Sequence, residues 1–533
     1  MARTLSLFHK RLALVACLGL AIYLVGNGAT SLWDRDEPRF AEAAREMVVT
    51  GDYVVPRFHG EIRFDKPPLI YWLMAGAYRL CGVGSFGARL PSALAGALSL
   101  VLVGLIGRRL VDERTGLAAA LVLGVCVQFV VEAKVATTDA LLLCTILAGQ
   151  LALLRSWQGD GGWGNFLLGW GAVGLGVLAK GPVAPMVVGV TAVALKVLGG
   201  RTWPWRPAGV AAGCALALLV MVPWAVAVQL ATDGEFLRVA FGHHVVERSI
   251  RSFESHRGPI WYYLATLPVS FFPWGFLGYG VLWEGWRRRD QAAARFLAAW
   301  FVVPFLIFSA AATKLPHYVL PTYPALALGL AWLATRPERP RWLVPLAMAN
   351  AVTALAAAGT LVVGGHRHLP DGAPFALLLL AACFAGSAAI LLAYRWRWQG
   401  MAVAASTALT LACLTGLTLP SLERFKPSPQ MVAALAAAAA PDRRYAFDYF
   451  EPSLVFHSGD TVTAVRDRDD LDILLASPAP FACVLRRELW DEIGPALPAV
   501  RVTRQIAGFN VAKGRWREWV VVAAQHVAPA GHP

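Results

Sequence analysis

The sequence of 533 residues contains little charge. Charged residues make up 15% of it, hydrophobic residues make up 57%, and the mean hydropathy is +0.54. A soluble domain is typically about 25% charged and about 45–50% apolar. One globular core cannot hide this apolar surplus, whereas a helix that passes through lipid is apolar on every side. The composition therefore excludes an ordinary soluble enzyme and predicts a polytopic α-helical membrane protein.

Several motifs are also missing. The eight cysteines stand singly, without a CxxC pair, so no disulfide framework or zinc ribbon is indicated. No Walker motif occurs and no glycines stand in a Rossmann context, so no nucleotide site of either kind is recognisable. The net charge of +14 does not indicate nucleic acid as a partner, because the arginines are dispersed between apolar runs.

The apolar runs approach the ~20 residues that a membrane-spanning helix needs. The thirteen runs are 11–28, 90–107, 115–131, 138–154, 164–179, 182–199, 208–230, 261–283, 294–311, 316–335, 342–363, 373–394 and 400–419. The first run lacks a small-x-small cleavage site, so we expect an uncleaved first helix. A further run, 67–82, is ambiguous from its composition.

The positive-inside rule decides the topology. With about 13 spans and a cytoplasmic N-terminus, the arginine clusters 108–114, 287–289 and 336–341 all lie in cytoplasmic loops. Counting 67–82 as a span would place them outside. We therefore predict that 67–82 is a helix at the outer membrane surface, within a long outer loop.

Two long polar loops, 29–89 and 231–260, are then periplasmic, together with the tail after residue 420. The tail has an Ala-rich helix followed by short β-like stretches, which predicts a small periplasmic α/β domain over 421–533 after a transmembrane domain over 1–420. Asp467-x-Asp469 matches a nucleotide-sugar pattern, but a turn with an Asp helix cap is the preferred interpretation.

Four segments carry recognisable chemistry. They are WDRDEPRFAEAAREM at 33–47, EIRFDKPPLIYW at 61–72, EAKVATTDA at 132–140 and TKLPHYVLPTYP at 313–324. Together they resemble the polyprenyl-phosphate-dependent class C glycosyltransferases, a superfamily that includes the protein O-mannosyltransferases. The nearest likeness is to the bacterial lipid A aminoarabinose transferases, and it covers most of the chain. D-E-P-R followed about 30 residues later by D-K-P-P is fairly specific for the family, but much less specific for the sugar.

The resemblance implies an inverting glycosyltransferase of the bacterial inner membrane with its site on the periplasmic side. The donor would be a sugar linked to undecaprenyl phosphate, and the acceptor lipid A or another periplasmic acceptor. Membrane lipid surrounds such an enzyme, and the family is linked to polymyxin resistance. Branches that modify proteins or other envelope glycans remain alternatives.

The resemblance also assigns the donor phosphate. It implies that Arg39 of D-E-P-R and Lys66 of D-K-P-P contact this group, whereas Arg248 matches only by its place after a His pair. A lipid phosphate needs such cationic donors at the membrane surface. Lys314, at the outer end of a span, is a further candidate. The alternative role for these cations is to set topology or to snorkel.

Asp36 is the carboxylate that the resemblance places in catalysis, where it would orient the acceptor oxygen or accept its proton. Asp34 and Glu37 are rivals, and each of the three acids is also a candidate cap for the following helix. Asp139, in T-T-D-A, resembles the family's second acidic residue. Lys180 is assigned a structural or merely exposed position.

Asp65 and His243 are candidate ligands for a divalent metal, zinc or magnesium, and His244 is an alternative ligand. Two protein ligands form an incomplete set, and the family relative has a glutamate where Asp65 stands. His317, Tyr318 and Tyr323 are secondary candidates at the outer end of a span, where an aromatic belt also explains the tyrosines.

Two other classes of protein are rivals. A transporter or flippase predicts ionisable residues near span midplanes and inverted repeats, and neither is seen. A non-enzymatic scaffold would not need the paired D-E-P-R and D-K-P-P motifs. The carboxylates gathered in the first outer loop favour an enzyme.

Overall fold

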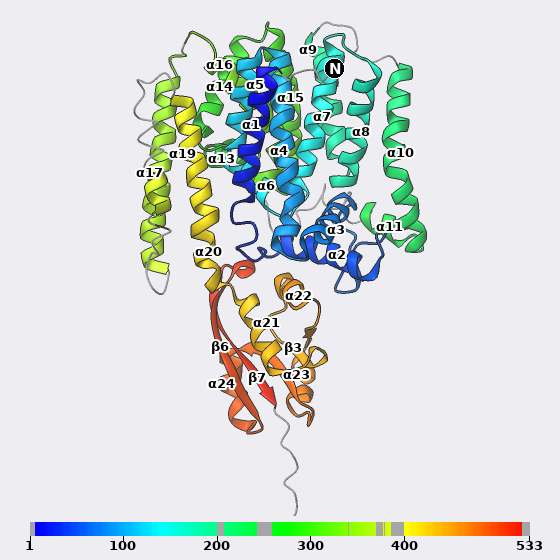
Figure 1. Ribbon diagram of the computed structural model, residues 1–533, viewed down its shortest axis with the longest axis vertical. Helices are drawn as coiled ribbons and strands as arrows, with labels where there is room; N and C mark the ends of the chain where they lie inside the picture. Colours follow the sequence, from blue (N-terminus) through cyan, green and yellow to red (C-terminus); the bar gives the residue numbers. More distant parts are fainter. Residues whose placement is uncertain are drawn as a thin grey trace, which may run out of the picture.

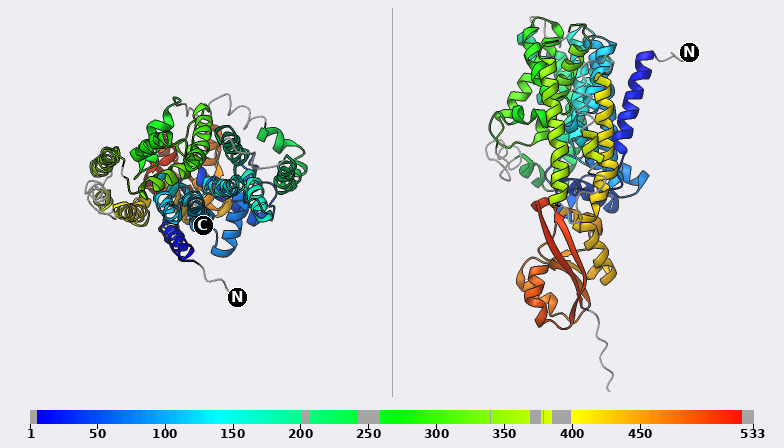
Figure 2. Two further views of the ribbon diagram at one scale, coloured as in Figure 1. Left: turned by 90° about the horizontal axis from the view of Figure 1, so that it is seen from above. Right: turned by 90° about the vertical axis from the view of Figure 1, so that its left-hand side faces the viewer.

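The apolar runs form helices because a chain surrounded by lipid must satisfy its backbone hydrogen bonds internally. Figure 1 shows the computed structural model, which describes residues 6–199, 207–241, 258–338, 340–368, 377, 379–384 and 399–524. A bundle of long helices forms one end of the molecule. A smaller part that contains a β-sheet projects from the opposite end along the long axis, as Figure 2 also shows.

The bundle contains most of the helices before residue 414. Their bounds are α1 (Leu7–Leu24), α4 (Ser85–Leu110), α5 (Glu113–Gly124), α6 (Val127–Lys134), α7 (Asp139–Trp157), α8 (Trp163–Lys180), α9 (Val183–Gly199), α10 (Pro207–Ala231), α11 (Glu235–Phe241), α13 (Tyr262–Ser270), α14 (Gly275–Arg287), α15 (Ala292–Ala310), α16 (Tyr323–Ala334), α17 (Leu343–His368) and α19 (Gln399–Cys413). Among the described residues, seven helices are long and apolar enough to cross a membrane, or eight with the bent pair α5–α6. The count of thirteen spans stays a prediction, since the run 373–394 lies largely outside the described residues.

Two expected spans are broken in the middle. The run 115–131 was expected to be one helix, but α5 and α6 meet at an angle of 67°. The run 261–283 divides into α13 and α14 around Pro273, which has no N–H with which to continue a helix. The two breaks face each other, because the Val127 amide donates to the Phe272 carbonyl over 2.9 Å. Backbone groups released by one break are thus satisfied by the other.

The first long loop folds at the end of the bundle that faces the sheet (Figure 1). It contains α2 (Asp36–Thr50), the short hairpin strands β1 (Arg57–Phe58) and β2 (Glu61–Ile62), and α3 (Leu69–Cys81). Buried side chains of α2 and α3, among them Phe40 and Tyr71, pack together as one apolar cluster. Helix α3 coincides with the run 67–82, whose place at the membrane surface stays a prediction.

The chain after α19 forms helices and a five-stranded sheet. Their bounds are α20 (Leu419–Leu422), α21 (Pro427–Ala438), β3 (Arg444–Ala446), α22 (Pro452–Ser458), β4 (Thr463–Ala464), α23 (Arg468–Leu475), β5 (Phe481–Arg486), α24 (Arg487–Ile493), β6 (Val500–Asn510) and β7 (Arg515–Ala524). The strand order is β4-β3-β5-β7-β6, with β3 parallel to β4 and β5, and β7 antiparallel to β5 and β6. The preferred interpretation of Asp467 is confirmed, since it caps α23 by accepting from the Asp470 amide over 2.9 Å.

Candidate active site

The loop that leads into α2 is fixed from inside by a buried ion pair. Glu37 accepts from Arg89 of α4 through both carboxylate oxygens at 2.8 Å, and from the backbone amides of Trp33 at 2.8 Å and Ala136 at 2.7 Å. Arg89 also donates to the Thr30 carbonyl over 3.0 Å. Burial opposes the charge of Glu37, but Arg89 and these amides hold the pKa of its carboxyl below the ordinary value. Glu37 is therefore occupied with structure.

The same loop is fixed from outside by the C-terminal part of the chain. Asp34 accepts from the Ser453 amide over 2.8 Å and from the Ser453 hydroxyl. Burial raises the pKa of Asp34 to about 6. Arg35 pairs with Glu451 at 3.5 Å, and Lys426 donates to the Ser31 carbonyl over 2.7 Å. Both rivals of Asp36, namely Asp34 and Glu37, are thus committed to holding the loop.

Asp36 and Arg39 remain available on this fixed frame. Asp36 is the first residue of α2 and is exposed, whereas Arg39 is half-buried. Neither forms a hydrogen bond or an ion pair with another described residue. A separation of three residues places both side chains on one face of α2. An acid and a guanidinium that are held in place but not paired can act on a bound ligand.

A second acid lies at the start of α7. Asp139 is buried, and both of its carboxylate oxygens accept from Lys180, at 2.7 and 2.9 Å. Sequence analysis assigned Lys180 a structural or merely exposed position and did not identify this pair, because its partner is 41 residues away. Lys180 also lies 5.4 Å from the ring of Tyr318. Lys180 therefore joins α8 to Asp139 and to the segment before α16.

His317 connects the two acids. It stands half-buried beside Tyr318, within electrostatic range of Asp36, Lys66, Asp139 and Lys180. Lys66 in turn acts electrostatically on Asp139. In the sequence His317 belongs to the segment 313–324, where it is a secondary candidate. Two candidate acids and two cations thus lie within electrostatic range of one imidazole.

Two predicted residues lie elsewhere. Tyr323 is buried in the core, where its hydroxyl shares a 2.5 Å hydrogen bond with Ser270. Lys314 is also buried, and its ammonium donates to the carbonyls of Ser309 at 2.7 Å and Ala311 at 2.5 Å at the end of α15. These contacts give both residues a structural task. Three further predicted residues, namely His243, His244 and Arg248, lie outside the described residues.

The predicted metal ligand Asp65 has a cationic neighbour. Its carboxylate lies 3.4 Å from the Arg63 guanidinium, and its carbonyl accepts from Lys66 over 3.1 Å. In the described ranges, no further His, Cys or acidic side chain joins Asp65 in a group of three that could hold an ion. The described residues alone do not form a metal site there.

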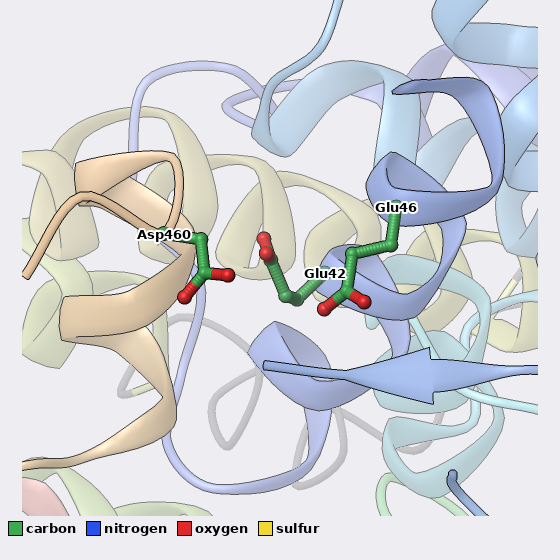
Figure 3. A group of neighbouring side chains, drawn as sticks. All are labelled: Glu42, Glu46 and Asp460. Atoms are coloured by element: carbon green, nitrogen blue, oxygen red, sulfur yellow. The ribbon is translucent and has the colours of Figure 1, made fainter. Parts of the chain in front are cut away.

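A group of acids with metal-like spacing lies further along α2. Figure 3 shows Glu42 and Glu46 of α2 turned toward Asp460 of the C-terminal part, with carboxylate oxygens within 4.8 Å. Each acid already has a partner. Glu42 accepts from Arg45 at 2.6 and 2.8 Å, Glu46 accepts from the His59 amide over 2.6 Å, and Asp460 bonds the His59 ring. This group joins the two parts of the molecule.

Comparisons with known proteins agree with this architecture. Residues 65–226 match the family described as dolichyl-phosphate-mannose-protein mannosyltransferase. The apo crystal structure of ArnT from Cupriavidus metallidurans superposes with a TM-score of 0.80 at 23% identity, covering 99% of this chain and 100% of that one. The protein has the class C glycosyltransferase fold. The archaeal oligosaccharyltransferase of Archaeoglobus fulgidus shares it more distantly, with a TM-score of 0.56 at 10% identity over 92% of this chain and 71% of that one.

Curated relatives are the undecaprenyl phosphate-alpha-4-amino-4-deoxy-L-arabinose arabinosyl transferases. The protein from Edwardsiella ictaluri is 31% identical over 335 residues, which cover 60% of this chain and 59% of the relative. The protein from Pseudomonas aeruginosa is 33% identical over 338 residues, which cover 59% and 58%. The chain thus spans about three fifths of the length of the relatives it matches. The resemblance predicted from the sequence is confirmed, and the chain is a polytopic, mostly helical membrane protein of this fold.

Proposed function

We propose that this glycosyltransferase-fold protein moves a sugar from undecaprenyl phosphate to an acceptor outside the bacterial inner membrane. The sugar we favour is 4-amino-4-deoxy-L-arabinose, and the acceptor is a phosphate of lipid A. The observation that carries the proposal is the available pair Asp36 and Arg39 on a loop fixed from both sides. The names of the relatives support the choice of sugar and lipid, as does the ArnT structure with bound undecaprenyl phosphate, which has a TM-score of 0.79.

The proposed reaction is a displacement at the anomeric carbon. The acceptor oxygen forms the new bond while the bond from the carbon to the phosphate oxygen breaks, and the phosphate leaves with the electron pair. Arg39 and Lys66 would stabilise the negative charge that develops on this leaving group. Attack from the opposite face inverts the configuration of the carbon.

The acids have different tasks in this proposal. Asp36 is exposed and unpaired among the described residues, so it orients the acceptor oxygen or accepts its proton. A phosphate acceptor arrives ionised and needs orientation only. Asp139 is neutralised by Lys180, so its proposed task is to keep this lysine directed toward the site. A divalent metal at Asp65 and His243 stays a hypothesis, and no step is assigned to it.

The proposal includes a topology. We infer thirteen spans, with α2, α3 and the C-terminal part on the periplasmic side and the arginine-rich loops in the cytoplasm. The donor phosphate would then reach the site from the outer leaflet, with its polyprenyl chain between helices. An alternative acceptor is a periplasmic protein, which the mannosyltransferase family description favours.

The test compares two acid substitutions in the same loop. Asp36→Asn keeps the shape and one acceptor oxygen but removes the charge, whereas Glu61→Gln changes an exposed acid of the nearby hairpin. Both variants are reconstituted in vesicles with undecaprenyl-phosphate-linked aminoarabinose and lipid A, and the product is measured by mass spectrometry. If Asp36 acts as a base on a hydroxyl, its variant should lose ~10²–10⁴-fold in turnover, the usual contribution of such catalysis.

The acceptor decides how large the loss is. With a lipid A phosphate, Asp36→Asn should retain more activity than with a hydroxyl-bearing peptide tested alongside. Turnover near that of Glu61→Gln with every acceptor would exclude a catalytic role for Asp36. A wild-type protein that transfers mannose to the peptide and no aminoarabinose to lipid A would replace the favoured substrates by the protein-modifying alternative.

A further inference from the structure

A cavity among the described residues lies between helices of the bundle. It has a volume of about 880 Å³ and is bounded by α9, α14, α15 and α16. Its walls are almost entirely apolar, with Val193, Leu282, Phe301 and Leu326 among them. Several wall residues are exposed on the flank of the bundle, including Val197 with 78% of its surface accessible. The cavity is therefore a groove open toward the surrounding lipid.

The groove has a cationic mouth. Arg289, which follows α14, and Arg295, in the first turns of α15, both line it at this end. Arg289 donates to the Trp286 carbonyl over 3.3 Å and lies over the Trp286 ring. The neighbouring arginines are also engaged, since Arg288 bonds Glu284 at 2.7 Å and Arg336 bonds Gln291 at 2.9 Å. By contrast, the Nε atom of Arg295 is buried and has no hydrogen-bond partner among the described residues.

The mouth is at the opposite end of the bundle from α2. Figure 1 shows the end of α9 and the start of α15 at the top of the view, and α2 at the bottom beside the sheet. One acid, Asp290, also lines the groove, but it is exposed. Two guanidiniums against one solvated carboxylate leave this end with a net positive charge.

We propose that the groove holds an anionic glycerophospholipid from the leaflet at this end, with its phosphate at Arg289 and Arg295. The acyl chains would cover the apolar walls. A buried guanidinium donor without a partner is costly, and a phosphate oxygen satisfies it by a charge-assisted hydrogen bond. Basic pockets between spans on the cytoplasmic side suit anionic head groups for this reason. A zwitterionic lipid would fill the groove without neutralising its mouth.

The groove offers a substitution that fills it without disturbing the fold. Gly285 lines the groove, and a Cβ built on it meets no atom within 4 Å. Gly285→Leu should therefore occupy the space intended for a chain. Gly171 on α8 is a matched control, because it is equally open and lies outside the groove. Arg11 near the exposed start of α1 is the matched control for Arg295.

The experiment is native mass spectrometry of the full-length protein in detergent, titrated with phosphatidylglycerol or with phosphatidylcholine of identical chains. We expect one tightly held phosphatidylglycerol in the wild type. Arg295→Gln should weaken it about tenfold or more, which is the scale of one lost charge-assisted contact. Gly285→Leu should weaken both lipids, whereas Arg11→Gln and Gly171→Leu should change neither.

Three results would overturn the proposal. The first is equal affinity for the two lipids in the wild type. The second is phosphatidylglycerol binding that neither Arg295→Gln nor Gly285→Leu weakens. The third is displacement of the bound lipid by undecaprenyl phosphate that Gly285→Leu blocks and Arg295→Gln does not, which would assign the groove to a polyprenyl chain.

Discussion

Two adjacent acids, Asp36 and Glu37, should respond to substitution in opposite ways. Glu37→Gln removes the charge opposite Arg89, whose side chain in this pair is only 4% exposed while that of Glu37 is 3% exposed. Each carboxylate oxygen of Glu37 accepts one hydrogen bond from Arg89 and one from a backbone amide. The side-chain NH2 group of the glutamine would therefore face N–H donors instead of accepting from them. Asp36→Asn removes no hydrogen bond or ion pair with a described residue. We expect Glu37→Gln to damage the fold and Asp36→Asn to leave it intact.

The size of the effect follows from burial. Removing one partner of a buried ion pair generally costs about 3–5 kcal/mol, because the other charge is left without compensation. The pair of Arg35 and Glu451 provides the comparison, since the Arg35 side chain is 43% exposed although that of Glu451 is only 10% exposed. An ion pair whose cation is solvated contributes little, about 0–1 kcal/mol when both partners are at the surface. Arg35→Gln should therefore be nearly neutral.

Equilibrium unfolding in mixed detergent micelles measures these differences, with the fraction of monodisperse protein after heating as a second readout. The expected order of stability is wild type, Asp36→Asn and Arg35→Gln together, and Glu37→Gln well below. The reasoning is refuted if Glu37→Gln is as stable as Arg35→Gln. It also fails if Asp36→Asn unfolds as readily as Glu37→Gln, because Asp36 would then hold the fold.

The remaining predictions concern the donor, pH and topology. Arg39→Ala and Lys66→Ala should each weaken binding of undecaprenyl phosphate roughly ten- to hundredfold, as measured by isothermal titration calorimetry. Unchanged affinity in both variants would mean that these cations only set the membrane topology. In the folded state the pKa of Asp34 is about 6, above the ordinary 3.8, so Asp34 keeps its proton to a higher pH than in the unfolded chain. The free energy of unfolding should therefore fall as pH rises between these two values. Asp34→Asn should remove up to about 3 kcal/mol of this dependence, and an unaltered pH profile would contradict it. In a cysteine-free background, an impermeant maleimide added outside should label a cysteine at position 60 and miss one at 288, and the reverse pattern would invert the proposed topology.

Composition and charge predicted the class of protein because every lipid-facing residue contributes to them. Breaks inside spans were not predicted, since the sequence stays apolar where α5 ends at Gly124 and α13 ends at Ser270. What stabilises these breaks is a contact between positions 127 and 272, and nothing local in the sequence reports that contact. Strand β7 is hard to identify from the sequence for a different reason. Its apolar run VVVAA does not by itself indicate a strand, because the strand is defined by pairing with β5 and β6 on either side.

The candidate site also has a part that the sequence could predict and a part that it could not. Motif resemblance selected Asp36, Arg39, Lys66 and Asp139, and the structure leaves the first two without hydrogen-bond or ion-pair partners among the described residues. Resemblance could not separate Asp36 from Asp34 and Glu37, because the difference lies in partners such as Ser453 and Arg89 that are distant along the chain. The partner of Lys180 could not be predicted for the same reason, because Asp139 is 41 residues away.

The contact between Asp34 and Ser453 spans 419 residues, and this has a consequence for biosynthesis. The loop that carries Asp36 leaves the ribosome early, but its outer fixation exists only after nearly the whole chain has been made. Until then Asp34 lacks Ser453 and the Ser31 carbonyl lacks Lys426. We therefore expect the nascent protein to be inserted and yet inactive. Activity would arise only in finished chains, so that a translation product truncated after residue 420 would occupy the membrane without consuming the lipid-linked donor.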